Sequence, residues 1–262
     1  MMSTSDFRIK YRPKKFSEVI GNKSIIQILK NIVTSHRIPN GILFHGLPGT
    51  VKSSIAYLFV KALNCLDFKE DVCGNCENCL LMEKYFPSGP CGIVEIHDCT
   101  IISENYLEDL IKRYFPIFPL NRVDKNIHVF DEFQRAKPSF QEKLLRPLET
   151  NPKLLLIFCL IDLTRVEEAF QQRVIILKTT RPELEELVSW LRRISSLERI
   201  TVKDTRALKD LAIAANLFPR ECLSILQKIS YLSNTLTVDL VKQVSKDNQS
   251  IHDEASTPIL IE

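Results

Sequence analysis

The stretch Gly41-Ile-Leu-Phe-His-Gly-Leu-Pro-Gly-Thr-Val-Lys-Ser-Ser54, residues 41–54, decides the fold. Its first five residues form a short apolar run typical of a buried strand, and its last residues open a segment with helical apolar spacing. A strand, a glycine-bearing turn and a helix in this order are the context of a phosphate-binding loop. In such a loop, backbone N–H groups at the helix N-terminus hold phosphates.

The side chains of this loop fit that chemistry at all positions but one. Lysine bridges the outer phosphates of a nucleotide, and the serine after it holds Mg²⁺. The glycine expected before the lysine is Val51, a β-branched residue that is poorly suited to close approach between backbone and phosphate. Whether the loop binds ATP with Mg²⁺ therefore stays open. The candidate cofactor-binding residues of the loop are Gly46, Gly49, Thr50, Lys52, Ser53 and Ser54.

Apolar, β-branched runs alternate with segments of helical spacing over the first two-thirds of the chain. This alternation predicts a parallel sheet with helices on both faces. One helical stripe consists of Ile25, Ile28, Leu29 and Ile32. The five expected strands are Gly41–His45, Ile93–Ile96, Ile127–Phe130, Leu154–Ile161 and Val174–Leu177.

The strand pattern stops near Thr180, and the rest of the chain has helical patterns. This shift in composition predicts a sheet domain over 1–179, a small helical domain over 180–246 and a polar, flexible tail over 247–262. The helices expected in the second domain are Pro182–Arg193, Asp204–Asn216, Pro219–Leu232 and a shorter one at 238–245.

Four cysteines lie within fifteen residues, as Cys65-x7-Cys73-x2-Cys76-x2-Cys79. The x2 spacing lets neighbouring thiolates turn onto one metal ion, so the pattern predicts a closed, structural Zn²⁺ site within an insert over 65–79. The alternative is four buried thiols that act as small apolar side chains. The polar residues between the cysteines disfavour it.

The segment Ile127-His-Val-Phe-Asp-Glu132 is an apolar strand that ends in two acids. At the carboxyl end of a strand in the same sheet as a phosphate-binding loop, Asp131 would hold a magnesium-bound water. Glu132 would orient an attacking water. The alternative for an acid pair after a strand is an ordinary solvated turn. The presence of the loop favours the catalytic interpretation.

Overall composition is that of a globular protein and excludes several classes. The chain has 262 residues, of which 45% are hydrophobic, and its apolar runs are too short to cross a bilayer. The net charge of +3 is too small to indicate nucleic-acid binding by itself. Eight cysteines without a secretory signal indicate a reducing compartment. All seven glycines fall in the first 92 residues, where unusual backbone geometry is expected.

These features, in this order, resemble the clamp-loader AAA+ ATPase family of bacterial DNA polymerase III, which includes the gamma/tau and delta-prime subunits. Three further stretches carry the resemblance. They are Tyr11-Arg12-Pro13-Lys14 with 16–21, the cysteine insert with 61–64 before it, and Leu144-Leu-Arg-Pro-Leu-Glu149. The resemblance implies an AAA+ P-loop domain with a five-stranded parallel sheet and a zinc insert, followed by a helical lid.

The resemblance also implies roles for residues outside the loop. Tyr11, Arg12 and Val19 would lie near the adenine, and Arg220 in the lid would touch bound nucleotide. Arg173 would act as an arginine finger on a neighbouring subunit's ATP. Departures from the family pattern are Val51, an acid at Asp162 in place of a polar sensor, Gln172-Arg173-Val174 in place of Ser-Arg-Cys, and no glycine before Arg220.

Two functions follow from the resemblance. The first is an ATP-dependent clamp-loader subunit that places a sliding clamp on primed DNA with its partner subunits, with hydrolysis weakened by the degenerate loop. The second is an ATPase-inactive, delta-prime-like subunit that acts through protein contacts. A more distant alternative is a protein of the same ancestry used outside replication. A cytoplasmic location without membrane contact is expected, and self-assembly is not, because the family's helical collar does not follow the lid.

Overall fold

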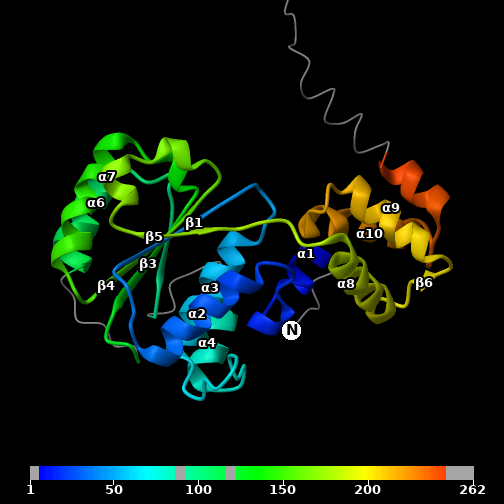
Figure 1. Ribbon diagram of the computed structural model, residues 1–262, viewed down its shortest axis with the longest axis horizontal. Coiled ribbons are helices and arrows are strands. Elements are labelled where there is room, and N and C mark those ends of the chain that lie inside the picture. Colours follow the sequence, from blue (N-terminus) through cyan, green and yellow to red (C-terminus); the bar gives the residue numbers. More distant parts are fainter. Residues whose placement is uncertain (1–5, 86–92, 116–121, 246–262) are drawn as a thin grey trace, which may run out of the picture. The chain divides into compact units, whose positions relative to one another are not determined.

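The computed structural model describes residues 6–85, 93–115 and 122–245, which belong to two compact units (Figure 1). One unit is Pro13–Thr180 and contains the large sheet. The other combines Met1–Arg12 with Arg181–Glu262 and is mostly helical. The expected tail over 247–262 lies outside the described residues.

The first unit has a five-stranded sheet in the order β2-β3-β4-β1-β5, and every neighbouring pair is parallel. The fold class expected from the sequence is confirmed. The strand β2 begins two residues later than predicted, because Ile93 and Val94 are buried ahead of it and pairing with β3 starts at Glu95. The strands are β1 (Gly41–His45), β2 (Glu95–Asp98), β3 (Asn126–Asp131), β4 (Leu154–Leu160) and β5 (Ile175–Lys178).

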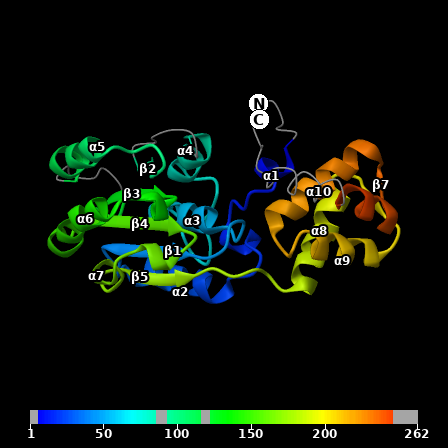
Figure 2. The same ribbon diagram turned by 90° about the horizontal axis from the view of Figure 1, so that it is seen from above.

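Helices cover both faces of this sheet, which explains why β4 is buried along its whole length (Figure 2). Alternate residues of β4 enter the two cores, since successive side chains of a strand point to opposite faces. Leu155 and Ile157 belong to the core under α2 and α3, and Leu156 and Phe158 to the core under α6 and α7. The helices are α2 (Lys23–Ser35), α3 (Lys52–Asn64) and α4 (Glu77–Tyr85) on one side, and α5 (Glu104–Asp109), α6 (Pro138–Thr150) and α7 (Glu168–Gln171) on the other.

Single turns connect several of these elements. They are the 3₁₀ turns η1 (Phe16–Glu18), η3 (Phe133–Arg135) and η4 (Leu163–Arg165), and the π-helical turn η2 (Leu110–Tyr114).

The buried face of the helix α2 follows the apolar stripe expected from the sequence, except at Ile28. Ile25, Leu29 and Val33 are its buried residues, at a spacing of four. Ile28 was expected in the same stripe but is 41% exposed, because it lies at the edge of the buried face. The next helix, α3, is buried from Ser54 to its end, as expected for a helix that follows the interior strand β1.

The second unit consists of helices and a minimal sheet. Phe7, in the first short helix, is buried, and its N–H donates to Oε1 of Gln227 at 3.1 Å. Residues 6–12 thus pack with the C-terminal helices, whereas the sequence pattern placed them with the sheet. The helices are α1 (Phe7–Lys10), α8 (Leu184–Leu197), α9 (Thr205–Ala214), α10 (Pro219–Leu232) and a short helix at 238–245. The minimal sheet is the parallel pair β6 (Thr201–Val202) and β7 (Thr235–Leu236).

In the part of the chain that the structure describes, each helix is too short or too polar to span a lipid bilayer.

Candidate functional site

The loop between β1 and α3 needs glycine at its first position. Gly46 has a φ of 148°, and a Cβ there would lie 2.5 Å from both the carbonyl oxygen and the hydroxyl of Thr179. Gly49 also has a positive φ, of 80°. These two glycines give the loop a course that other residues would adopt only with strain.

The buried Thr50 fastens the loop to the end of β5. Its hydroxyl donates to the carbonyl oxygen of Leu47 at 2.7 Å and lies 2.7 Å from the hydroxyl of Thr179. Thr179 in turn bonds the last carbonyl of β1, at His45. Sequence reasoning missed Thr179, although its place directly after an apolar strand of the sheet was a usable signal.

Lys52 and Ser53 place a cation and a hydroxyl at the N-terminus of α3. The ammonium of Lys52 donates to the carbonyl oxygens of Gly46 and Leu47, each at 2.8 Å, which holds the positive charge over the loop. The hydroxyl of Ser53 lies 3.0 Å from Oδ2 of Asp131. The structure therefore brings together the loop lysine, the loop serine and the first acid of β3. Such a set can bind a phosphate and its Mg²⁺.

The second acid, Glu132, adopts a left-handed conformation with a φ of 53° just after β3. Its N–H donates to Oδ1 of Asp131 at 3.0 Å, and its carboxylate accepts a hydrogen bond from Gln134. The side-chain oxygen of Gln134 accepts from the N–H of Ile161 at 3.2 Å. Gln134 therefore links the acid to the end of β4, a role that its sequence position gave no reason to expect.

Val51 keeps the left-handed backbone that a glycine would adopt freely. Its φ is 59° and its ψ 23°, a conformation that costs a residue with a Cβ about 1–2 kcal/mol. Its half-buried side chain packs against the core under α2 and α3. The substitution therefore preserves the shape of the loop and introduces backbone strain beside Lys52.

Two further candidates belong to the sheet unit. Val19 is half-buried and packs against the core under α2 and α3, and Ser54 is buried in the first turn of α3.

Three candidate nucleotide-binding residues, Tyr11, Arg12 and Arg220, belong to the helical unit. The hydroxyl of Tyr11 donates to the carboxylate of Glu198, and burial together with that carboxylate raises the pKa of Tyr11. Arg220 is exposed in the first turn of α10, directly after the buried Pro219.

Arg173 and Asp162 both engage groups close to them in the sheet unit. The guanidinium of Arg173 pairs with Glu149 and also donates to the carbonyl of Ala169. Asp162 caps the turn η4 by accepting from the N–H of Thr164 at 3.0 Å, and its exposed carboxylate has a pKa lowered by the Thr164 hydrogen bonds. Both side chains are thus occupied by local partners.

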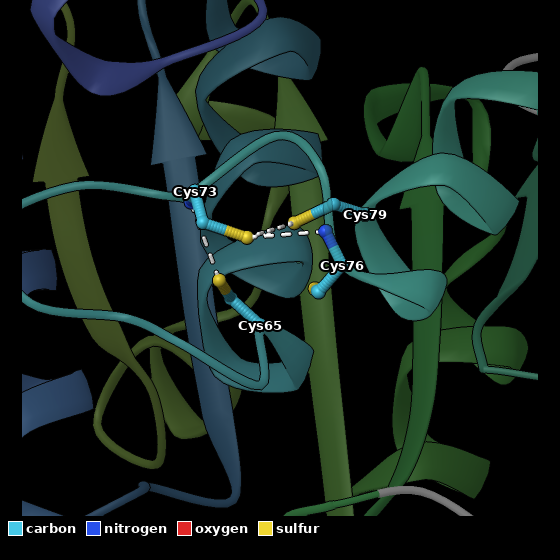
Figure 3. Close-up of side chains that lie close together, drawn as sticks. All are labelled: Cys65, Cys73, Cys76 and Cys79. Carbon is cyan, nitrogen blue, oxygen red and sulfur yellow. Dashed lines mark hydrogen bonds between the residues drawn. The ribbon is translucent and has the colours of Figure 1, made fainter.

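The four cysteines of the insert converge from the end of α3, the following loop and the start of α4 (Figure 3). Their sulfur atoms all lie within 4.8 Å of one another. The sulfurs of Cys73 and Cys79 are 3.9 Å apart, too far for a disulfide. That separation is close to the roughly 3.8 Å between ligands of a tetrahedral site with Zn–S bonds of about 2.3 Å.

Backbone N–H groups point at these sulfurs, as they do around metal-bound thiolates. The N–H of Cys76 donates to the sulfur of Cys73, and that of Cys73 to the sulfur of Cys65, each at 3.3 Å. Burial raises the pKa of Cys65 and Cys79. Burial opposes ionisation at Cys73 as well, but donors from Asn75 and Cys76 outweigh it and lower its pKa to about 6. The donor set fits Zn²⁺ and suits a closed site.

A parallel five-stranded sheet, a phosphate-type loop after β1 and an acid pair after β3 define an α/β P-loop ATPase fold of the AAA+ class. The fold is similar to that of a solved structure, the Thermotoga maritima RuvB Holliday junction branch migration motor, with a TM-score of 0.66. The two sequences are 16% identical, and the match covers 90% of this chain and 72% of that one.

The chain belongs to the family described as "DNA polymerase III, delta subunit", whose family model matches residues 21–183. The DNA polymerase III subunit gamma/tau of Mycoplasma pneumoniae is 29% identical over 88% of this chain and 33% of its own length. The Arabidopsis thaliana protein STICHEL is 31% identical over 91% of this chain and 19% of its own length. The Bacillus subtilis subunit tau is 26% identical over 87% of this chain and 40% of its own length. The chain thus spans well under half the length of these relatives.

Proposed function

We propose that this chain is a clamp-loader subunit of a DNA polymerase III-type replication machinery that binds ATP with Mg²⁺ and hydrolyses it slowly. Its partners would be other clamp-loader subunits and a sliding clamp, with primed DNA reached through the complex, in the cytoplasm. The homology to gamma/tau and tau subunits supports this assignment.

The observation that carries ATP binding is the contact between Ser53 and Asp131. The serine at the helix N-terminus and the acid at the end of β3 lie 3.0 Å apart, as two groups that share one Mg²⁺ require. The ammonium of Lys52 lies over the same loop, and Glu132 follows the acid. When bound, Mg²⁺ would neutralise phosphate charge, Ser53 and Asp131 would hold it, and Glu132 would orient water.

Slow hydrolysis is supported by two features of this chain. The strained Val51 limits how freely the loop adjusts around phosphate, since a β-branched residue has only a narrow left-handed region open to it. Arg173, the candidate arginine finger, is held by Glu149 of its own chain. An arginine that acts on a neighbouring subunit would first have to leave this carboxylate.

A second function, an ATPase-inactive delta-prime-like subunit, is favoured by Val51 and by the delta-subunit family model. In that case the chain hydrolyses no ATP and acts through its protein contacts. We propose for either function that the cysteine cluster binds one structural Zn²⁺, which would fix α4 to the end of α3.

The decisive experiment measures ATP binding and hydrolysis with sliding clamp, partner subunits and primed DNA present. The expected result is binding of a labelled ATP analogue and DNA-stimulated turnover that Lys52→Met lowers by about 10- to 100-fold, since a hydrogen bond from a charged group contributes about 1.5–3 kcal/mol. Lys242→Met, at an exposed lysine of the 238–245 helix, is the matched control.

Each outcome decides between the functions. Analogue binding without turnover supports the inactive subunit. Absence of both binding and turnover contradicts ATP binding. Equal effects of the two lysine variants would show that Lys52 has no special role.

A further inference from the structure

A second cluster of side chains of metal-binding type lies outside the cysteine insert, on the strands β2 and β3. It consists of Glu95, His97 and His128, whose ligand atoms lie within 4.8 Å of one another. Glu95 and His128 are directly paired across the two parallel strands, and His97 is on the same face of β2 as Glu95. Strand pairing therefore brings the three side chains together without any loop.

The three ligand atoms form a compact triangle. Nε2 of His97 and Nδ1 of His128 are 3.0 Å apart, and Oε2 of Glu95 lies 3.9 Å from the first and 3.5 Å from the second. A circle through three points with these separations has a radius of about 2.0 Å. That is the usual bond length from a zinc-type ion to imidazole nitrogen or carboxylate oxygen, about 2.0–2.2 Å.

We propose that Glu95, His97 and His128 bind a divalent transition-metal ion, distinct from the ion of the cysteine cluster. Two imidazoles and one carboxylate are a donor set for Zn²⁺, Co²⁺, Ni²⁺ or Fe²⁺. The site links the edge strand β2 to β3, three residues before Asp131. It does not depend on whether the phosphate loop binds ATP.

The surroundings of the two rings fix their orientation. Nδ1 of His97 lies 3.2 Å from the hydroxyl of Tyr106. When Nδ1 donates its proton to that oxygen, Nε2 offers its lone pair. His128 is completely buried and packs against Phe115, with ring centroids 4.8 Å apart. A hydrogen bond at the second ring nitrogen, as at His97, holds metal-binding imidazoles in place in known metal sites, whereas Nε2 of His128 has no hydrogen-bond partner among the described residues.

Both histidine rings are buried, which keeps them close to one position. The Glu95 side chain is 38% exposed, which gives an ion access from solvent. The cluster thus combines two buried imidazole donors with one carboxylate donor at the surface.

A hydrogen bond between the two rings, whose centroids are 5.3 Å apart, accounts for the contact of the two nitrogens but not for the position of Glu95. One proton between Nε2 of His97 and Nδ1 of His128 would satisfy those two atoms only. The Glu95 oxygen would stay at 3.5 and 3.9 Å, beyond hydrogen-bond distance of both nitrogens. A shared cation explains why a carboxylate approaches two ring nitrogens without a hydrogen bond to either one.

The test is a titration of the metal-stripped, reduced 262-residue chain with Co²⁺ and with Zn²⁺, followed by absorption spectroscopy, calorimetry and metal analysis. Two ions per chain are expected. Cobalt at the cysteine cluster gives intense thiolate-to-metal charge-transfer bands, whereas cobalt at the Glu95 cluster gives only weak visible bands. Wild-type protein therefore reports the two sites separately.

Glu95→Gln and His97→Gln should each lower the affinity of the second site at least about 100-fold, since loss of an outer contact alone costs 10- to 100-fold. Both should leave the charge-transfer bands unchanged. His36→Asn, at an exposed histidine after α2, is the matched control and should bind two ions. If His97→Gln does not fold, Glu95→Gln decides, because that side chain is partly exposed.

One ion per chain in the wild type would overturn the proposal. So would two ions with unchanged affinity in Glu95→Gln and in any folded His97→Gln protein.

Discussion

The hydroxyl of Ser53 lies 3.0 Å from Oδ2 of Asp131, although 78 residues separate them in the chain. The strand β1, which precedes the loop before Ser53, is not a neighbour of β3, which ends at Asp131, because β4 lies between them in the sheet. The loop after β1 places Ser53, in the first turn of α3, beside the carboxyl end of β3.

This contact predicts that Ser53 and Asp131 share one Mg²⁺. Asp131→Asn and Ser53→Ala should each remove most of the increase in ATP affinity that Mg²⁺ produces, a loss of about 10-fold or more. Each variant removes one of the two oxygen groups that hold the ion. Calorimetric titration with ATP, with and without Mg²⁺, measures the effect. Asp98→Asn is the control, since Asp98 also ends a strand but caps Thr100. Equal Mg²⁺ dependence in wild type and Asp131→Asn would contradict the assignment.

The strained residue of the loop gives a second prediction. Val51→Gly should raise affinity for an ATP analogue about 3- to 10-fold, because relief of about 1–2 kcal/mol of backbone strain lets the loop adjust. The folding stability should change little, since the lost packing of a half-buried valine offsets the relief. Fluorescence titration and urea unfolding measure the two effects. Tight analogue binding in the wild type with no gain in Val51→Gly would show that Val51 does not weaken the site.

The strands of the sheet could be predicted from the sequence because an interior strand is marked by a local run of apolar residues. A run such as Leu154–Leu160, apolar at every position, fits only an interior strand covered on both faces. The edge strand β2 was misplaced by two residues, since its pairing depends on β3 and its outward residues are polar. Ile28 was assigned to the buried face of α2 because periodicity alone does not show where a helix face meets solvent.

The residues of the candidate site likewise divide into those that the sequence predicted and those that it did not. The four cysteines lie close in space, as their spacing implied. Ser53 and Asp131 also lie close, as expected for a phosphate loop and an acid at the end of a strand in the same sheet. Thr179 and Gln134 were missed, because each acts through hydrogen bonds that strand order sets and that no motif marks. The Glu95 cluster was missed for the same reason: its histidines are 31 residues apart and meet only through strand pairing.

The cysteine cluster predicts one tightly held zinc ion that stabilises the sheet unit. Cys76→Ser should release that ion and lower the midpoint of thermal unfolding by at least about 5 °C, since an ion at a thousand times its Kd contributes about 4 kcal/mol. Metal analysis and calorimetry report both effects. Cys222→Ser, at a buried cysteine of α10 outside the cluster, should keep the zinc. Full zinc content in Cys76→Ser would contradict the ligand assignment.

The contact between the N-terminal segment and α8 predicts a pH dependence of stability. Burial raises the pKa of Glu198, but hydrogen bonds from Lys10 and Tyr11 outweigh burial and hold that pKa below its ordinary 4.5. A carboxyl whose pKa is lower in the folded state stabilises the fold above the ordinary pKa, and this contribution is lost as the pH falls through and below it. Wild type should therefore lose stability between pH 6 and pH 3.

Glu198→Gln should lose less stability over that range, and should be less stable than wild type at pH 7 by about 1.5–3 kcal/mol, the contribution of hydrogen bonds to a charged group. Urea unfolding at each pH measures both. Glu185→Gln is the control, because that exposed glutamate pairs with Lys209 at the surface. A pH profile for Glu198→Gln that parallels the wild type would rule out this carboxyl as the origin.

The last prediction concerns Lys61, whose ammonium is buried within α3. It donates to Oε1 of Glu83 at 2.6 Å, and its side chain has no exposed area. Glu83→Ala should destabilise the fold by about 3–5 kcal/mol, because it leaves a buried charge without its carboxylate. The double variant Lys61→Met with Glu83→Ala should recover most of that loss, since it removes the charge that needs a partner. Urea unfolding compares them with Glu142→Ala, an exposed control on α6. Equal stability of the two alanine variants would show that the Lys61 charge does not depend on Glu83.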